Sequence, residues 1–181
     1  MSLKAFEYAF HEVLGVEGGY STDPKDPGNW TGGSPGRGEL KGTKCGISAK
    51  AYPHLDIKNL TPENIKGIYY VDYWKALSLD EVPDQEVAKE IFDSAVNCGN
   101  GNAVKFVQRS CNFLGDKIKV DCTMGPLTLS HIKKWCDKDP RAFHKALNGF
   151  QFIHYNALVE AGAPYGYGWL KRIQSYRDGN T

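Results

Sequence analysis

The chain has 181 residues, of which 41% are hydrophobic, and it carries 22 lysines and arginines against 21 aspartates and glutamates. A chain of this length can bury one core, or one core with a subdomain, without requiring a large assembly. Because the cations are scattered rather than gathered into a stripe, nucleic-acid binding is poorly supported, and no apolar run approaches the length of a membrane span.

The first predicted element is an amphipathic helix that delivers a carboxylate to a flexible corner. Its apolar face is formed by residues at helical spacing, namely Leu3, Phe6, Phe10, Val13 and Leu14. Glu17 follows at the end of this run, directly before Gly18, Gly19 and Tyr20. Negative partial charge on the last carbonyls of a helix and limited solvent access would both raise the pKa of Glu17. We therefore predict that Glu17 is a general acid.

The next segment, residues 21–44, is rich in glycine and proline and is too long for a simple connector. It predicts a wall of a binding cleft or a short β-hairpin. Helices are then expected over residues 62–74, 85–98, 104–114, 126–135 and 140–161, with a last turn or two around Trp169 and Ile173. Thr61, Asp84 and Asp139 are the predicted helix caps. The pattern indicates a mainly α unit with one irregular insertion.

Several kinds of chemistry find little support in the sequence. The five histidines lack the spacing of a metal site, so we expect no metal and no organic cofactor. The five cysteines are odd in number and mostly fall among apolar neighbours, which favours buried free thiols. A cysteine nucleophile, Cys45 or Cys98, paired with a histidine stays open as a minor alternative.

Two aspartates follow Glu17 across a turn that is rich in proline and glycine. Asp26 lies nine positions after Glu17, and Asp23 lies between them. Glycoside hydrolysis needs a protonated acid that assists the leaving sugar oxygen and an ionised partner that activates water or stabilises the cationic sugar. Aspartates next to proline also make ordinary turns, so for Asp23 and Asp26 both a turn-making role and a catalytic role stay open.

Blocks of sequence along nearly the whole chain resemble the secretion-activator family, classified as glycoside hydrolase family 108. The N-terminal blocks are Glu17-Gly18-Gly19-Tyr20, Asp23-Pro24, Asp26-Pro27-Gly28 and Thr43-Lys44-Cys45-Gly46-Ile47-Ser48. The later blocks are residues 92–97 with Gly99, Ala103-Val104 and Gln108, then Asp121 with Gly125-Pro126 and Thr128, and finally residues 168–173. Members of this family are lysozyme-like N-acetylmuramidases, and the second half resembles the peptidoglycan-binding region that accompanies the catalytic segment.

The resemblance implies roles for individual residues. Glu17 is the expected catalytic acid, Asp26 the partner carboxylate, and Thr43 a hydroxyl that positions water. This chain departs from the family by extra residues, 29–42, between the Asp-Pro-Gly turn and the threonine. Thr31 is nearer to the turn, but Thr43 keeps the following Gly-Ile pair at the family spacing, so we prefer Thr43.

Aromatic and polar side chains near these residues are candidates for binding the glycan. Tyr20 and Trp30 are expected to stack on sugar rings, whereas Tyr69 and Tyr73 share a helical face with Ile65 and are expected to pack in the core. Asp23 and Asn97 complete the predicted substrate-binding set. Asp93 and Asn97 lie one helical turn apart and could support the acid, but a helix cap or an internal hydrogen bond explains them equally well.

The sequence thus predicts a mainly α, lysozyme-like domain with an irregular or short β-hairpin insertion after the first helix. Residues 1–83 are the expected catalytic segment, and residues 84–181 the peptidoglycan-binding-like region, packed as one compact unit. The predicted function is hydrolysis of the β-1,4 bond between N-acetylmuramic acid and N-acetylglucosamine. A non-catalytic peptidoglycan-binding module and a regulatory protein that assists secretion are the alternatives.

The expected partner is the peptidoglycan glycan strand, and we expect a monomer. Lys171, Arg172 and Arg177 could meet an anionic polymer, but the sequence favours a solvated helix face for them. No signal peptide is recognisable, so the protein is expected to be made in the bacterial cytoplasm and to reach the wall, in the periplasm or outside the cell, by an unknown export route. An N-terminus that has been trimmed is the alternative, and lysis, wall remodelling and secretion would all use the same chemistry.

Overall fold

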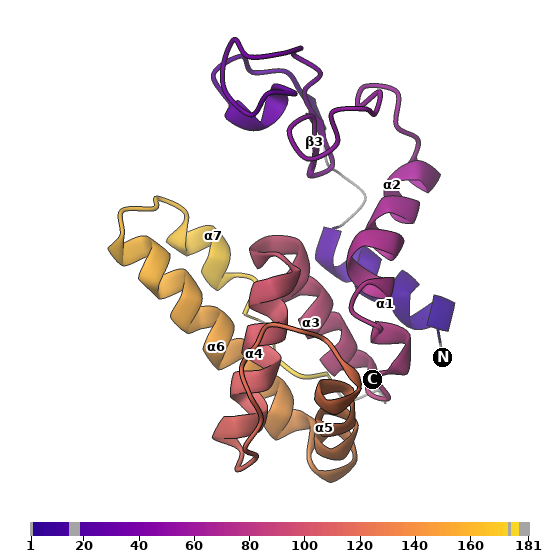
Figure 1. The fold of residues 1–181 in the computed structure, drawn as a ribbon, viewed down its shortest axis with the longest axis vertical. Helices are drawn as coiled ribbons and strands as arrows, with labels where there is room; N and C mark the ends of the chain where they lie inside the picture. The colour runs from indigo at the N-terminus through magenta and orange to yellow at the C-terminus, as the bar shows by residue number, and fades with distance from the viewer. Residues whose placement is uncertain (1, 15–18, 174, 178–181) are drawn as a thin grey trace. The chain divides into compact units, whose positions relative to one another are not determined.

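The computed structural model describes residues 2–14, 19–173 and 175–177 and is mainly α, as the sequence predicts (Figure 1). The α-helices in this part of the chain are α1 Ser2–Leu14, α2 Pro62–Tyr69, α3 Gln85–Cys98, α4 Asn100–Phe113, α5 Pro126–Lys138, α6 Pro140–Glu160 and α7 Gly166–Leu170. Short helical turns are η1 Pro27–Asn29, η2 Tyr70–Lys75 and η3 Leu79–Glu81, and the strands are β1 Tyr20–Ser21, β2 Thr43–Lys44 and β3 Ile47–Ser48.

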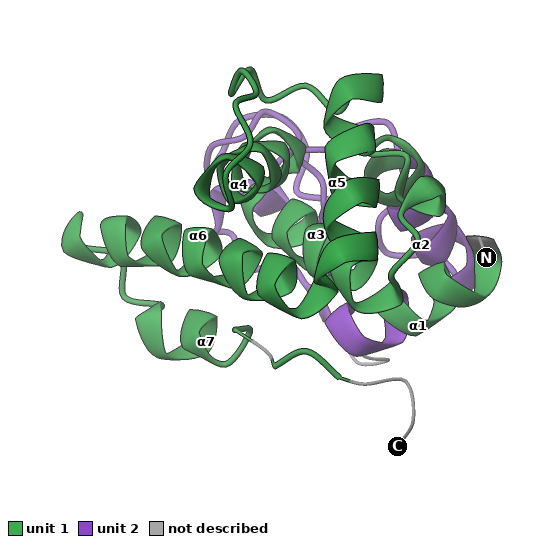
Figure 2. Cartoon of the chain, turned by 90° about the horizontal axis from the view of Figure 1, so that it is seen from below, with its two compact units in different colours: residues 1–9, 72–181 green, residues 10–71 purple. Residues whose placement is uncertain are grey.

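The chain divides into two compact units, which Figure 2 colours separately. Unit 1 holds residues 1–9 and 72–181, and unit 2 holds residues 10–71. This division follows contacts in space, whereas the boundary expected at residue 83 follows blocks of sequence. α1 therefore contributes its first part to unit 1 and its end to unit 2.

Local signals set the helix starts at the expected residues. Thr61 forms a capping box with Asn64, in which the Thr61 hydroxyl accepts from the Asn64 N–H and the Asn64 side chain accepts from the Thr61 N–H. Asp84 accepts from the N–H of Val87 at 2.9 Å, and Asp139 caps α6 in the same way. These three predicted caps are confirmed. The helix expected to end near Trp74 continues beyond α2 as the π-helical turn η2.

Unit 2 is built around a small antiparallel sheet in the order β1-β2-β3. Lys44 pairs with Ile47, so Cys45 and Gly46 alone connect β2 to β3, and both have positive φ, 47° and 77°. Positive φ at both positions is the signature of a type I′ hairpin turn. A Cβ at Gly46 would lie 2.6 Å from the Tyr69 hydroxyl, so glycine is required for close packing as well as for backbone geometry. Tyr69 is buried as expected and donates to the Cys45 carbonyl at 2.9 Å.

The core of unit 1 forms around α3, which is buried from Glu86 through Ala95. At one end, Phe6 packs edge-on against Trp74 and Phe92, with ring centroids 5.5 and 5.9 Å away. The expected central role of α3 is confirmed by its packing against α4 and α6. The predicted apolar face of α1 is only partly correct, because Leu3 is 63% exposed.

A buried carboxylate, Asp116, joins the end of α4 to α5. It accepts hydrogen bonds from His131 at 2.6 Å, from the Trp135 indole at 2.7 Å and from the Lys134 ammonium. Burial disfavours the ionised form, but these hydrogen bonds outweigh burial and lower the pKa of Asp116 to about 2. The contribution to stability is therefore present above the ordinary pKa of 3.8 and is lost as the pH falls towards about 2.

We expect Asp116→Asn to lower the free energy of unfolding by about 2 to 3 kcal/mol at pH 7, because three donors, among them the buried Trp135 indole, lose a charged acceptor. Urea unfolding measures this loss. Glu81→Gln is the matched control, since Glu81 and Lys133 form an exposed pair at 2.9 Å whose loss should cost no more than about 1 kcal/mol. Equal losses in the two variants would contradict the role given to Asp116.

Ionisable side chains are also buried between α3 and α6. Glu90 is 2% exposed, and its Oε2 lies 3.6 Å from Nε2 of His144, which is 1% exposed. Burial and the nearby Asp93 carboxylate raise the pKa of Glu90 well above its ordinary value. Burial and the Lys89 ammonium lower the pKa of His144 to about 4. Both groups thus favour their neutral forms in the folded protein.

Glu90→Gln is expected to stabilise unit 1 increasingly as the pH rises above about 4.5, the ordinary pKa of glutamate. Because the pKa of Glu90 is raised by folding, the parent loses stability with rising pH by up to about 1.4 kcal/mol per pH unit, and the amide removes this loss. Urea unfolding at pH 5 and pH 7 measures the difference between variant and parent. A difference that does not grow between these two pH values would show that Glu90 is ionised in the folded state.

None of the helices in the described residues combines the length and the apolarity that crossing a membrane requires.

Candidate active site

The turn that carries both predicted aspartates is folded by their own side chains. Oδ1 of Asp23 accepts from the N–H of Lys25 at 2.9 Å, and Oδ1 of Asp26 accepts from the N–H of Gly28 at 2.8 Å. Asp26 also caps η1, which begins at Pro27. The turn-making role is therefore present at both positions. Both residues are exposed.

Asn29 fastens this turn to the rest of unit 2. Its side chain is fully buried and donates from Nδ2 to the Asp23 carbonyl at 3.0 Å. Its own carbonyl accepts from the N–H groups of both Lys41 and Gly42, at 3.1 and 3.0 Å. The sequence analysis missed this residue, because an asparagine after Asp-Pro-Gly is an ordinary turn residue and nothing local marks it as buried.

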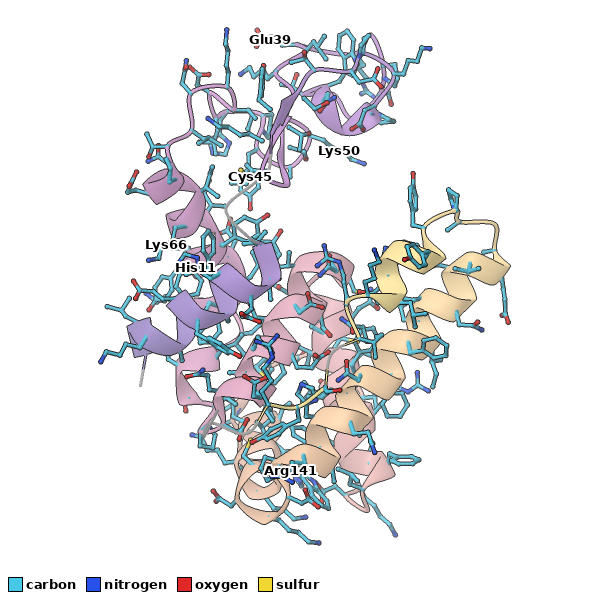
Figure 3. The ribbon with its side chains drawn as sticks, turned by 180° about the vertical axis from the view of Figure 1, so that it is seen from behind. His11, Glu39, Cys45, Lys50, Lys66 and Arg141 are labelled. Atoms are coloured by element: carbon cyan, nitrogen blue, oxygen red, sulfur yellow. The ribbon has the colours of Figure 1, made fainter. Side chains whose placement is uncertain are left out.

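The extra residues between turn and threonine fold as a hairpin, as the glycine-rich pattern suggests. Trp30 forms a β-bridge with Leu40, and the Thr31 N–H donates to the Glu39 carbonyl, while the Glu39 N–H donates to the Thr31 hydroxyl oxygen. Glu39 is labelled in Figure 3 on the returning arm of this hairpin. The hairpin starts and returns at Asn29, whose carbonyl accepts from the N–H groups at the end of the hairpin. The Trp30 indole N–H donates to the Pro24 carbonyl at 2.9 Å, which ties the hairpin to the turn.

Thr43 lies in the central strand of the sheet, paired with Ser21 on one side and Ser48 on the other. The turn of Asp26 lies beside β3. A Cβ built on Gly28 would lie 3.8 Å from Cβ of Ser48, and the Gly28 carbonyl accepts at 3.0 Å from the N–H of Lys50, which Figure 3 labels. Asp26 and Thr43 therefore belong to one hydrogen-bonded framework.

Thr31, the alternative threonine, uses its hydroxyl inside the hairpin. Its Oγ1 accepts from the N–H of Glu39 at 2.9 Å, which stabilises the hairpin locally. Tyr20, the predicted sugar-stacking residue of β1, is 39% exposed, and its hydroxyl donates to the Lys41 carbonyl at 3.1 Å. The tyrosine ring is thus held at the edge of the sheet with part of its surface open to solvent.

Asn97 lies in unit 1, near the end of α3, and its amide is used internally. Nδ2 donates to the carbonyl of Asp93 at 2.8 Å and to its Oδ1 at 3.0 Å. Asp93 also accepts from Gln151 at 2.8 Å and pairs with Arg172 at 3.2 Å. Burial raises the pKa of Asp93 despite these partners. The Asn97 side chain therefore has an internal structural role in unit 1, which is the alternative that the sequence analysis left open.

Glu17, the predicted general acid, lies outside the described residues. The chain is described up to Leu14, the last residue of α1, and again from Gly19, which precedes β1. The described part of the candidate site therefore consists of Asp26, Thr43 and the residues that hold them.

The structure gives no support to a cysteine nucleophile or to a metal site in the described residues. Burial raises the pKa of Cys98 to about 11, which disfavours the thiolate that a nucleophile requires. Cys45 occupies the β2–β3 turn, and none of the five cysteines, all within the described residues, forms a disulfide. Cys111 and Cys136 are buried, whereas Cys122 is exposed. In the part of the chain that the structure describes, no three histidine, cysteine, aspartate or glutamate side chains gather as a metal site would require.

Comparisons with known proteins match both halves of the chain. Residues 10–99, which include the turn and the sheet, match the model of the family described as Glycosyl hydrolase 108. Residues 102–174 match the model described as Predicted Peptidoglycan domain. The two matches follow one another along most of the chain and confirm the resemblance drawn from the sequence motifs.

Among solved structures, the chain is similar to SagA from Brucella abortus, with 25% sequence identity and a TM-score of 0.69. The likeness covers 94% of this chain and 90% of that chain, which confirms the mainly α, lysozyme-like fold class. No curated protein matches the chain significantly.

Proposed function

We propose that this chain, which belongs to the glycosyl hydrolase 108 family, is a peptidoglycan muramidase that cleaves the β-1,4 bond between N-acetylmuramic acid and N-acetylglucosamine. Glycosidases of this kind work with two carboxyl groups. Glu17 donates a proton to the leaving sugar oxygen. Asp26 activates water or stabilises the cationic sugar, and Thr43 positions the water. No metal or organic cofactor takes part.

The observation that carries this proposal is the way Asp26 is held. One carboxylate oxygen is fixed by the Gly28 N–H at 2.8 Å, and the residue is exposed, so the other oxygen is available to a water or a sugar. A single fixed oxygen orients the carboxylate without neutralising it. The turn is joined to the chain just after β3 by the hydrogen bond from the Lys50 N–H to the Gly28 carbonyl, and β3 pairs with the strand of Thr43, so the two polar groups are supported by linked backbone.

Stereochemistry depends on the separation of the two carboxyl groups. Retaining enzymes hold them about 5 to 5.5 Å apart, whereas inverting enzymes leave about 6.5 to 9.5 Å for a water molecule. A carboxylate at Asp26 suits either role, as nucleophile or as general base.

Mass spectrometry of digested peptidoglycan tests the reaction. The purified protein is incubated with sacculi, and the released fragments are reduced and sequenced. A new reducing end on N-acetylmuramic acid is the expected product. A reducing end on N-acetylglucosamine, or a free stem peptide, would assign a glucosaminidase or an amidase instead.

The match of residues 102–174 to a predicted peptidoglycan domain favours one alternative, a wall-binding module without turnover. Such a module would co-sediment with sacculi and release no fragments. The same digestion therefore separates the two functions.

A further inference from the structure

An unusual group of aromatic residues lies at the end of unit 1. Tyr165, Tyr167 and Trp169 alternate with two glycines in and just before α7. Tyr165 is 64% exposed and Tyr167 is 77% exposed. Large aromatic side chains are usually well buried, so two neighbouring exposed tyrosines point to a binding surface. We call Tyr165, Tyr167 and Trp169 the aromatic platform.

The platform is anchored to the helices beneath it. α7 runs alongside α6 in both ribbon views (Figures 1 and 2). The Trp169 ring stacks on buried Tyr155 of α6, with centroids 5.2 Å apart and planes 13° apart. Arg172, just after α7, pairs with Asp93 of α3 at 3.2 Å. These two contacts hold the backbone of α7, so the tyrosines are presented on a supported element.

The glycines keep the platform close to α6 and open to solvent. A Cβ at Gly166 would lie 2.9 Å from Cγ2 of Val159, so a larger residue would push α7 away from α6. A Cβ at Gly168 would meet nothing within 4 Å, so the backbone of α7 is open at this position. The Tyr165 ring packs against Trp169 with centroids 5.7 Å apart, yet both tyrosines keep most of their surface exposed. Exposed aromatic rings suit a ligand that is itself a chain of rings with apolar faces.

A cation stands beside the exposed rings. Nζ of Lys171 lies 4.5 Å from the centroid of the Tyr167 ring, and Lys171 is exposed. Peptidoglycan combines N-acetylated sugar rings with carboxylates on its stem peptides, so rings next to an ammonium complement both parts of this polymer.

We propose that Tyr165, Tyr167 and Lys171 form a wall-anchoring site that binds a glycan strand together with its acidic stem peptides. The two tyrosines stack on sugar rings, and Lys171 pairs with a stem-peptide carboxylate. The site holds the polymer and takes no part in bond cleavage. This proposal rests on the proposed function in that both concern the same polymer, but its test needs no cleavage.

Co-sedimentation with purified sacculi tests the site, in a Glu17→Gln background so that the sacculi stay intact. The double variant Tyr165→Ala/Tyr167→Ala is expected to raise the apparent Kd roughly tenfold, which corresponds to about 1.4 kcal/mol for two stacking rings. Phe113→Ala is the matched control, because Phe113 is an equally exposed aromatic residue, 75% exposed, on α4. It should leave the Kd unchanged. Because the altered tyrosines are exposed, the thermal midpoint should not change.

Lys171→Glu separates the two parts of the ligand. It should weaken binding to sacculi severalfold and leave binding to chitin unchanged, because chitin has N-acetylated sugars without stem peptides. The tyrosine variant should weaken binding to both polymers. Equal weakening on both polymers by Lys171→Glu would overturn the role of this lysine.

Unchanged binding of the tyrosine double variant would overturn the site. If the parent is a dimer in solution and the double variant is a monomer with unchanged binding, the platform instead takes a second copy of this chain. Failure of the muramidase proposal has a different signature, since sacculi would then still be bound through the platform while no fragments are released.

Discussion

Replacement of Glu17 by glutamine is expected to lower the rate of sacculus lysis by about 10² to 10⁴-fold. Glutamine has nearly the same shape as glutamic acid, but its amide cannot supply an acidic proton to the leaving sugar oxygen. The loss should therefore appear in the rate, with binding to sacculi retained. The initial rate of turbidity loss measures the effect, and co-sedimentation measures the binding.

A matched control is available in the same unit. Glu39 is an exposed glutamate on the inserted hairpin, with 76% of its side chain accessible, and it pairs with Lys41 at 3.3 Å. Glu39→Gln makes the same substitution elsewhere in unit 2 and should change the rate by no more than about twofold, because surface pairs contribute little. If Glu17→Gln also lyses sacculi at the parental rate, the assignment of the general acid is wrong.

The sequence predicts features that depend on a few neighbouring residues. Thr61, Asp84 and Asp139 cap their helices because each short polar side chain reaches an N–H group only three residues ahead. The periodic apolar residues of α3 likewise predict a helix buried in the core. Such features need no knowledge of distant parts of the chain.

Features set by distant contacts were not predictable in the same way. Asn29 is buried because the chain returns to it after a hairpin, at Lys41 and Gly42, and no local pattern encodes that return. The burial of Glu90 against His144 joins residues of α3 and α6 that are 54 positions apart, as 144 − 90 = 54. A helical pattern alone would place a glutamate on a solvated face.

The candidate site shows both kinds of feature. The roles of Asp23 and Asp26 in the turn follow from their neighbours, and the turn interpretation and the catalytic interpretation need not compete. A carboxylate has two oxygens, so Asp26 can fix the turn with Oδ1 and present the other oxygen to a reacting group. The choice between Thr31 and Thr43 depended on the fold of the insertion, in which the Thr31 hydroxyl bonds to the Glu39 N–H.

The second large effect is expected from Asp26→Asn, compared with Asp23→Asn. Both residues are exposed, and both accept a turn N–H with Oδ1, which an asparagine side chain can also do. Both variants should therefore keep the turn and the thermal midpoint of the parent. Asp26→Asn loses the charge that activates water or stabilises the cationic sugar, so kcat on soluble glycan fragments should fall by about 10² to 10⁴-fold.

Asp23→Asn should instead act through substrate binding, since Asp23 is proposed to contact the glycan without reacting. Its effect is expected in KM, with kcat close to that of the parent. The same fall in kcat for both variants would contradict the separate role given to Asp26, because both carboxylates would then affect turnover alike. A fall in kcat for Asp26→Asn alone would require a role for its charge beyond the Gly28 hydrogen bond, since an asparagine preserves that bond.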